Sequence, residues 1–356
     1  MTTLITGATG FVGGEVLVRL LEQTGDDVVA LVRAEDDERA QARIDAALDH
    51  LLPPGTVPAR RVRAVAADLE RPHLGLTPRR CLRLAAELDA VIHCAASIEF
   101  TLPLERATAI NVDGTRELLR LAGCAPGLRR FVHVSTAFVA GDRAGRFLET
   151  EGDVGQTCRN TYEQTKLAAE QEVLAAGLPG TVIARPSIVV GDSATGWTSA
   201  FNVIYWPLQA FARGLFPTVP ADPGAPVDIV PVDAVADALL DLLGGDERGA
   251  VHVVAGDDAP TLGALARLAS AAFGRPEPAF VGPGEAPEAE RLAGPLLPYL
   301  RVRGTFDGGR RHAAGLEPPP LTDYFGALVA YADEARWGKR PQRRWERLHR
   351  LQRAAA

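Results

Sequence analysis

The stretch Leu4-Ile5-Thr6-Gly7-Ala8-Thr9-Gly10-Phe11-Val12-Gly13 decides the fold. Its first three residues form a short apolar run typical of a strand, and apolar side chains then recur at helical spacing from residue 16 to residue 21. The glycines between them permit a tight turn and a close approach to the backbone. A pyrophosphate fits such a turn because it accepts hydrogen bonds from amides at the positive end of the helix. The segment therefore predicts a dinucleotide-binding strand, turn and helix.

The alternation of strand and helix continues outward from this segment. We expect further strands at residues 28–32, 63–67, 90–94, 131–134, 181–184 and 251–254, with helical segments between them. Strands that alternate with helices form a parallel sheet with helices on both faces. The sequence therefore predicts the α/β class, with a Rossmann-type doubly wound parallel sheet and a smaller carboxy-terminal substrate-binding subdomain.

The domain boundaries follow from where the alternation stops. We assign residues 1–195 to the dinucleotide-binding domain, to which residues 227–260 return, and residues 196–226 and 261–335 to the substrate-binding subdomain. Residues 276–298 are rich in Pro, Gly and Glu, and we expect a mobile loop there. The insertion after residue 196 is rich in aromatic residues, about half of which we expect to line the substrate pocket: Trp197, Phe201, Tyr205, Trp206, Phe211 and Phe216.

A tyrosine and a lysine stand four residues apart in Asn160-Thr161-Tyr162-Glu163-Gln164-Thr165-Lys166. The chain has 38 basic residues, but its only lysines are Lys166 and Lys339, so an ammonium at position 166 indicates a need for a compact charge. Residues i and i+4 share a helix face. A nearby cation favours the phenolate, and we therefore expect Lys166 to lower the pKa of Tyr162 and to suit it to general acid catalysis.

Polar and small residues follow several of the predicted strands, where ligands of a parallel sheet gather. Arg33 ends the second strand, where an Arg suits a ribose 2'-phosphate, and Arg43 is a second candidate; NADP is favoured over NAD, although Asp36 and Asp37 are close by. Asp68 follows the third strand and is placed to meet the adenine. Among the hydroxyls after the strand at 131–134, Thr136 is the first choice and Ser135 the second to bind the substrate oxygen.

Composition restricts the class of protein. The formal charge is -7, and residues 336–356 carry eight basic residues and one acidic residue, which leaves -14 on the rest. An acidic body argues against general nucleic-acid binding. The tail is expected to be a basic helix that packs on the body or docks an acidic partner. We expect a cytoplasmic protein with no signal peptide or membrane span, four reduced cysteines and no metal site.

These residues together resemble the extended short-chain dehydrogenase/reductases over most of residues 2–260. Within that superfamily the chain is similar to the thioester reductase and fatty acyl-CoA reductase branch, which includes the reductase domains of carboxylic acid reductases and some peptide synthetases. The branch resemblance rests on these segments: Leu31 to Ala34 with Arg43, Ile92 to Ser97 with Phe100, Val134 to Val139, Asn160 to Lys166 with Glu170, and Gly191 to Ser193 with Thr195 and Gly196.

The resemblance implies NADPH-dependent reduction of an acyl thioester, on CoA or on an acyl or peptidyl carrier protein, to an aldehyde and possibly an alcohol. Tyr162, assisted by Thr136 and Ser135, would act on the substrate oxygen, and Lys166 would hold the nicotinamide ribose. The full cofactor-binding set that we expect is Thr6, Gly7, Thr9, Gly10, Phe11, Val12, Gly13, Arg33, Arg43, Asp68, Leu69, Cys94, Ala95, Ala96, Asn111, Tyr162, Lys166, Pro186, Ser187 and Ile188.

Two other functions are compatible with the same fold. An oxidoreductase of free ketones or alcohols, or a nucleotide-sugar epimerase or dehydratase, would share most of the signature, but an epimerase prefers NAD and Arg33 counts against it. A dinucleotide-sensing protein without chemistry would not need Thr136, Tyr162 and Lys166 together. The sequence does not determine the oligomeric state.

Overall fold

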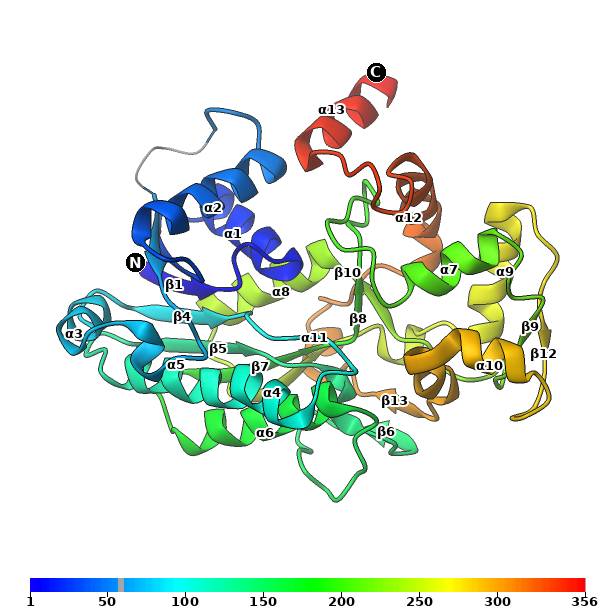
Figure 1. Ribbon diagram of the computed structural model, residues 1–356, viewed down its shortest axis with the longest axis horizontal. Helices are drawn as coiled ribbons and strands as arrows, with labels where there is room; N and C mark the ends of the chain where they lie inside the picture. Colours follow the sequence, from blue (N-terminus) through cyan, green and yellow to red (C-terminus); the bar gives the residue numbers. More distant parts are fainter. Residues whose placement is uncertain (57–60, 356) are drawn as a thin grey trace.

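A seven-stranded parallel sheet forms the centre of the protein in the computed structural model, which describes residues 1–56 and 61–355. The strands lie in the order β3-β2-β1-β4-β5-β7-β11 (Figure 1). Their bounds are β1 Thr2–Thr6, β2 Asp27–Val32, β3 Val62–Ala66, β4 Ala90–His93, β5 Arg130–Val134, β7 Thr181–Pro186 and β11 Gly249–Val253. The order reverses at β1, as it does in a doubly wound sheet, so the predicted fold class is confirmed.

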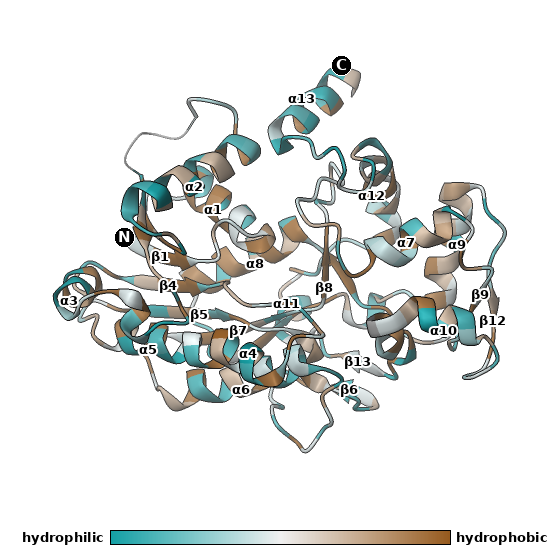
Figure 2. Ribbon diagram, viewed as in Figure 1, coloured by the Kyte–Doolittle hydropathy of each residue, from teal (hydrophilic) through white to brown (hydrophobic). Residues whose placement is uncertain are grey.

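Helices cover both faces of this sheet (Figure 1). On one face lie α1 (Phe11–Gln23), α2 (Asp37–Leu51) and α8 (Val232–Gly244), and their apolar residues pack with those of the strands into one core. On the other face α3 (Pro78–Ala85), α5 (Gly114–Gly123) and α6 (Thr161–Ala175) take part in a second core. The hydrophobic colouring of the strands between these layers in Figure 2 reflects burial on both faces.

The helical segment between β4 and β5 is interrupted. It consists of α4 (Leu104–Thr108), a π-helical turn at Ala109–Asp113, and α5. A π-helical turn inserts an extra residue into the helix and is common at functional sites. It carries Asn111 into the interior, where the side chain is buried.

The carboxy-terminal part packs around a third core, to which α7 (Tyr205–Ala212), α9 (Leu262–Phe273) and α12 (Leu321–Glu334) contribute. Three short parallel strand pairs join distant segments: β8 (Ile188–Val190) with β10 (Ile229–Pro231), β9 (Thr218–Val219) with β12 (Ala279–Phe280), and β6 (Gly145–Phe147) with β13 (Gly304–Phe306). The remaining elements are the short helices Pro72–Gly75, Ala137–Ala140, Gly256–Asp258, η5 (Gly294–Arg301) and α11 (Gly309–Ala313), with α10 (Pro287–Ala293) and α13 (Arg344–Ala355).

Two expectations for this part are wrong. Residues 276–298 are not a continuous loop, because they contain β12, α10 and the start of η5. The aromatic residues after Gly196 are mostly core: Trp197, Tyr205, Phe211 and Phe216 are buried, and Trp206 is 40% exposed. An insertion of this size needs its own apolar core, and α9 and α12 supply the other side of it.

The basic tail forms the expected helix and packs on the body. Arg344 pairs with the buried carboxylate of Glu15 on α1 at 3.0 Å, and the Trp345 ring donates a hydrogen bond to the Asp49 carbonyl of α2 at 3.1 Å. Arg347 is buried and donates to the Thr195 carbonyl at 2.9 Å. Several tail arginines therefore bind the protein itself and are not available to a partner.

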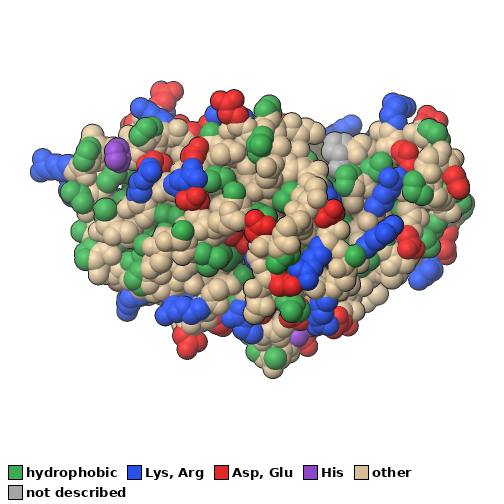
Figure 3. Space-filling view, turned by 90° about the horizontal axis from the view of Figure 1, so that it is seen from below, with side chains coloured by type: hydrophobic (Ala, Val, Ile, Leu, Met, Phe, Trp, Pro, Cys, Tyr) green, Lys and Arg blue, Asp and Glu red, His purple; other side chains and the backbone are tan. Residues whose placement is uncertain are grey.

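Charge on the face shown in Figure 3 is mixed, with Lys/Arg and Asp/Glu side chains interspersed over the surface. Charged residues of the protein also form local pairs, such as Arg116 with Glu172 at 2.8 Å. No helix in residues 1–56 and 61–355 combines the length and the apolar character that crossing a bilayer requires.

Gly13 is a position where the close approach of the turn excludes a side chain. A Cβ added to Gly13 would lie 2.2 Å from the carbonyl oxygen of Gly7. We expect Gly13→Ala to lower the free energy of unfolding in urea by about 1–3 kcal/mol, because the backbone must shift. The control is Gly152→Ala, where an added Cβ meets nothing within 4 Å, and whose effect should stay within about 0.5 kcal/mol. Equal stability of the two variants would contradict this account of the turn.

Candidate active site

The glycine turn meets the end of β4 at backbone contact distance. Gly7 has a positive φ of 74°, and a Cβ there would lie 2.8 Å from the Ala95 nitrogen. Gly10 N donates to the Gly7 carbonyl at 2.8 Å and α1 begins at the next residue. Thr9 and Gly10 are exposed, whereas Phe11 and Val12 pack partly against the core. This cradle of backbone amides, closed to side chains, fits a pyrophosphate.

Hydrogen bonds of Thr6 and His93 connect the end of β1 to the end of β4 beneath the glycine turn. The Thr6 hydroxyl oxygen accepts a hydrogen bond from Ala95 N at 3.1 Å and lies 2.7 Å from His93 Nδ1. The other ring nitrogen of His93 lies 2.9 Å from the Thr115 hydroxyl. Burial lowers the pKa of His93 to about 3, so the ring is neutral. His93 thus packs as a structural residue, and it fixes the turn that carries Ala95 and Ala96.

The predicted adenine and ribose side of the site lies at the ends of β2 and β3. The Arg33 side chain is 73% exposed and faces Glu70 at 3.6 Å, while the Arg43 guanidinium from α2 donates to the Arg33 carbonyl. Asp68 is half-buried, and its carboxylate accepts from Glu70 N at 3.1 Å. Leu69 packs partly into the second core. The structure therefore brings Arg33 and Arg43 together at one exposed edge.

Asn111 has a different role from the predicted cofactor contact. Its amide oxygen accepts from Ser97 N at 2.7 Å, and its amide nitrogen donates to the Ser97 carbonyl and to the Thr165 hydroxyl, each at 3.0 Å. Both polar groups of the side chain are thus used within the protein. Asn111 joins the loop after β4 to helix α6, and we withdraw its assignment as a direct cofactor ligand.

Helix α6 carries Tyr162 to the end of strand β5. Its N-cap is Asn160, whose side chain accepts from Glu163 N at 2.9 Å. Burial raises the pKa of Tyr162 to about 12, and a hydrogen bond with the Thr136 side chain opposes this rise. The Thr136 hydroxyl also lies 3.4 Å from the Pro186 carbonyl. Two hydroxyls from different elements therefore meet at one point.

Ser135 and Ser187 are buried on either side of this point, and each hydroxyl has no hydrogen-bond partner among the residues that the structure describes. Buried hydroxyls are normally satisfied, so such groups indicate a place for a ligand. Pro186 ends β7, and Ile188 begins β8 beside it. The residues present therefore fit a nicotinamide and a carbonyl substrate.

Lys166 lies one turn after Tyr162 and is 2% exposed. Its ammonium donates to the Val134 carbonyl at 2.7 Å and lies 3.4 Å from His133 Nε2. Burial lowers the pKa of Lys166 to about 8, although the nearby Glu170 carboxylate opposes the change. The cation is thus held at the carboxyl end of β5 by backbone and by a neutral imidazole, which the sequence analysis did not identify.

The expected effect of Lys166 on Tyr162 is wrong for this structure. The pKa of Tyr162 is raised rather than lowered, because burial of the phenol dominates. The Lys166 ammonium donates a hydrogen bond to the Val134 carbonyl instead. Helical spacing alone therefore did not bring the ammonium into strong interaction with a Tyr162 phenolate. A neutral Tyr162 is the form that donates a proton.

A buried ion pair that the sequence analysis left without a role fixes helix α6 against the sheet. Arg185 of β7 donates to Glu170 of α6 through two hydrogen bonds of 2.9 and 2.6 Å, and both side chains are 3% exposed. Glu170 is one turn beyond Lys166, and Arg185 directly precedes Pro186. The one available signal was a charged residue within an otherwise apolar strand, which indicates a buried partner.

Comparison with known proteins shows which family the chain resembles. The sequence profile of the family described as Male sterility protein, a family of NAD-binding domains, matches residues 5–239. Glycine betaine reductase of Emericella nidulans is 32% identical over 68% of this chain and 20% of its own length. Fatty acyl-CoA reductase 1 of Xenopus laevis is 31% identical over 67% of this chain. The chain spans about half of that second relative, 53% of its length.

A solved structure extends the likeness to nearly the whole chain. The terminal R domain of the myxalamid PKS-NRPS biosynthetic pathway superposes with a TM-score of 0.79 at 27% identity, over 96% of this chain and 92% of that one. The predicted resemblance to the thioester reductase and fatty acyl-CoA reductase branch is thus confirmed. With a profile that matches most of its length, the chain belongs to the Male sterility protein family.

Proposed function

We propose that this protein is an NADPH-dependent reductase of acyl thioesters. The observation that carries the proposal is the meeting of the Tyr162 and Thr136 side chains at the end of β5, with Lys166 buried one helical turn away. A reductase needs a proton donor and a second hydrogen-bond donor where the carbonyl oxygen develops charge. The names of two relatives, a fatty acyl-CoA reductase and the terminal R domain of a PKS-NRPS pathway, support the substrate class.

The bound nicotinamide would supply a hydride to the carbonyl carbon of the thioester. Tyr162 donates its hydroxyl proton to the carbonyl oxygen, and Thr136 and Ser135 stabilise the negative charge that develops there. The product is a hemithioacetal, which breaks its carbon–sulfur bond to give an aldehyde and a free thiol. Lys166, buried one helical turn from Tyr162, would hold the hydroxyls of the nicotinamide ribose. A second hydride transfer to the aldehyde would give an alcohol.

Specificity for NADPH follows from the exposed edge formed by Arg33 and Arg43. A 2'-phosphate there meets two guanidinium groups, which bind phosphate through charge-assisted hydrogen bonds. The glycine cradle would hold the pyrophosphate, and Pro186, Ser187 and Ile188 would orient the nicotinamide. CoA or a carrier protein would present the acyl group; the relatives include a fatty acyl-CoA reductase and the terminal R domain of a PKS-NRPS pathway.

The first prediction concerns the proton donor. Tyr162→Phe should lower kcat with an acyl-CoA by about a hundredfold or more, because general acid catalysis is lost while the ring still fills its site. NADPH affinity, measured by fluorescence titration, should change less than about threefold, because the ring makes no phosphate contact. Tyr324→Phe, which alters a buried tyrosine of the third core, is the matched control and should keep its activity. A Tyr162→Phe enzyme with near wild-type turnover would contradict the mechanism.

The second prediction concerns cofactor choice. The double variant Arg33→Ala/Arg43→Ala should raise the KM for NADPH by about tenfold or more and leave the KM for NADH nearly unchanged, because only NADPH carries the 2'-phosphate. Arg39→Ala is the control, since Arg39 lies on the same helix but pairs with Glu35. If the ratio of the two KM values stayed at the wild-type level, these arginines would not select the cofactor.

The third prediction uses the pH dependence of stability. The pKa of Lys166 falls from 10.5 to about 8 on folding, so between these values the unfolded state binds more protons and the wild type gains stability as pH rises. Lys166→Met removes this group. Its melting temperature should therefore exceed that of the wild type near pH 7. The gain in the free energy of unfolding should be on the order of 3 kcal/mol, minus the contribution of the lost hydrogen bonds, and the activity should be lost.

The difference in melting temperature should shrink as pH rises through about 8 towards 10.5. Lys339→Met is the matched control, because Lys339 is the other lysine and is exposed. Its melting temperature should differ little from that of the wild type at any pH. A difference for Lys166→Met that stays constant across this range would show that Lys166 is not a desolvated ammonium.

A further inference from the structure

Tyr299 reaches the catalytic helix from the carboxy-terminal part of the chain. It lies on η5, and its ring stacks on Phe100, with centroids 5.1 Å apart at 22°. Phe100 in turn lies 5.9 Å from the ring of Tyr162. On another side the Tyr299 ring meets the edge of Phe138 at 5.2 Å, and Phe138 follows Thr136 by two residues. The ring is therefore separated from the proposed proton donor by a single aromatic side chain.

The polar end of Tyr299 is fixed to the start of α6. The Asn160 side chain, the N-cap of that helix, donates to the Tyr299 hydroxyl at 2.8 Å. The Arg159 guanidinium lies over the Tyr299 ring at 5.5 Å and is itself held by Glu163 at 3.0 Å. Rings held by stacking, an edge contact and a cation occupy one position, so Tyr299 forms a rigid surface.

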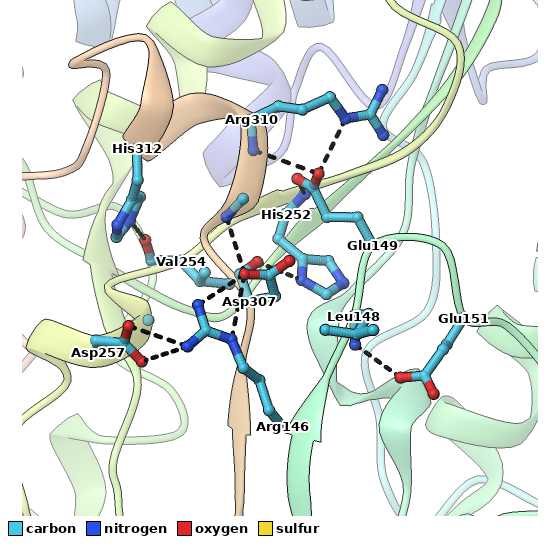
Figure 4. Close-up of polar contacts among 12 residues, drawn as sticks. Arg146, Leu148, Glu149, Glu151, His252, Val254, Asp257, Asp307, Arg310 and His312 are labelled. Carbon is cyan, nitrogen blue, oxygen red and sulfur yellow. Dashed lines mark hydrogen bonds and ion pairs between the residues drawn. The ribbon is translucent and has the colours of Figure 1, made fainter.

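The segment behind Tyr299 is anchored as well. β13 follows η5 and pairs with β6 in parallel register, Thr305 opposite Arg146. Figure 4 shows the side chains beside this pair: Arg146 points to Asp257 and Asp307, and Arg310 points to Glu149. Arg146 meets Asp307 at 2.8 Å, and Arg310 meets Glu149 at 2.9 Å. The carboxy-terminal segment thus holds Tyr299 in place against the catalytic half.

Tyr299 is also part of the wall of a cavity beside the nicotinamide-facing segment. Phe138, Ile188, Tyr299, Val302 and Phe306 supply its apolar lining, and the room left inside the cavity is about 20 Å³. That is roughly the space of a single water molecule, so the aromatic rings leave little room for a long chain. We propose that Tyr299 is a specificity-determining residue, whose ring limits the size of the acyl group and selects short, apolar acyl thioesters.

The cavity lining contains one carboxylate, and its hydrogen bonds to the protein backbone indicate that the acyl group is apolar. Asp228 borders the cavity, but its two oxygens accept hydrogen bonds from Ala255 N at 2.9 Å and Gly256 N at 2.8 Å. Burial raises the pKa of Asp228, and the hydrogen bonds from these two amides oppose that rise. The carboxylate is therefore occupied by backbone, and the aromatic wall is what an acyl chain meets. This inference rests on the proposed thioester reduction.

The experiment compares butanoyl-CoA with decanoyl-CoA as substrates and measures kcat/KM for each with NADPH. Tyr299→Ala should raise the decanoyl to butanoyl ratio of kcat/KM by about tenfold or more, because each additional methylene that a pocket accepts changes this constant by about tenfold or more. Tyr299→Leu should give a smaller increase in the same direction. Tyr299→Phe keeps the ring and loses the bond to Asn160, so its ratio should stay within about threefold of the wild-type value.

Trp206→Ala is the control for removal of an aromatic side chain from the same part of the protein, because Trp206 packs on Phe216 away from the cavity. Its ratio should match the wild type. An unchanged ratio in both Tyr299→Ala and Tyr299→Leu, each verified as folded by its melting temperature, would overturn the inference. If Tyr299→Ala does not fold, Tyr299→Leu and Tyr299→Phe decide the question. Failure of the wild type to reduce any thioester would instead refute the proposed function.

Discussion

The ion pair between Arg185 and Glu170 is the contact on which the arrangement of the site depends. It joins the strand that leads into Pro186 and Ser187 to the helix that carries Tyr162 and Lys166, and both members are almost fully buried. The same guanidinium also donates to the Glu151 carbonyl at 2.8 Å and covers the ring of Phe147. Because a buried charge without its partner is costly, this pair tolerates little displacement of the helix relative to the strand. This ion pair therefore fixes the helix of Tyr162 directly to the strand that leads into Pro186.

Burial of charge continues around Lys166. The ammonium has a backbone carbonyl and a neutral imidazole as neighbours, and Glu170 is the nearest carboxylate that favours its charged form. Such an environment lowers the pKa of the ammonium, and the buried charge destabilises the folded state. Functional sites commonly retain such a loss of stability, because the buried group that destabilises the fold is also the group that the chemistry uses. The hydroxyls of Ser135 and Ser187, buried without partners in the described part of the chain, belong to the same pattern.

Local signals predicted the elements well and the contacts between them poorly. The strands and the glycine turn follow from periodicity and turn chemistry, and the structure has the strands of the central sheet within two residues of the prediction. The role of Asn111 was wrong because a π-helical turn, which has no clear sequence signal, turns its amide towards Ser97. The pKa of Tyr162 was wrong in direction because helical spacing reports distance along one helix and not burial. About half of the aromatic residues after Gly196 were expected to line the pocket, but most of the six form the core of the insertion.

The sequence by itself determined the order of strands and helices, the position of the glycine cradle, and the residue types at the carboxyl ends of the strands. These features are local, because each depends on backbone conformation and side-chain spacing within a few residues. Only the tertiary structure decided which side chains meet: Arg185 with Glu170, His133 with Lys166, and Tyr299 with Phe100 and Asn160. Tyr299 is 137 residues from Tyr162 along the chain, and no local preference encodes their proximity. Contacts of that kind result from the packing of one core against another, where burial and charge pairing select one arrangement from many.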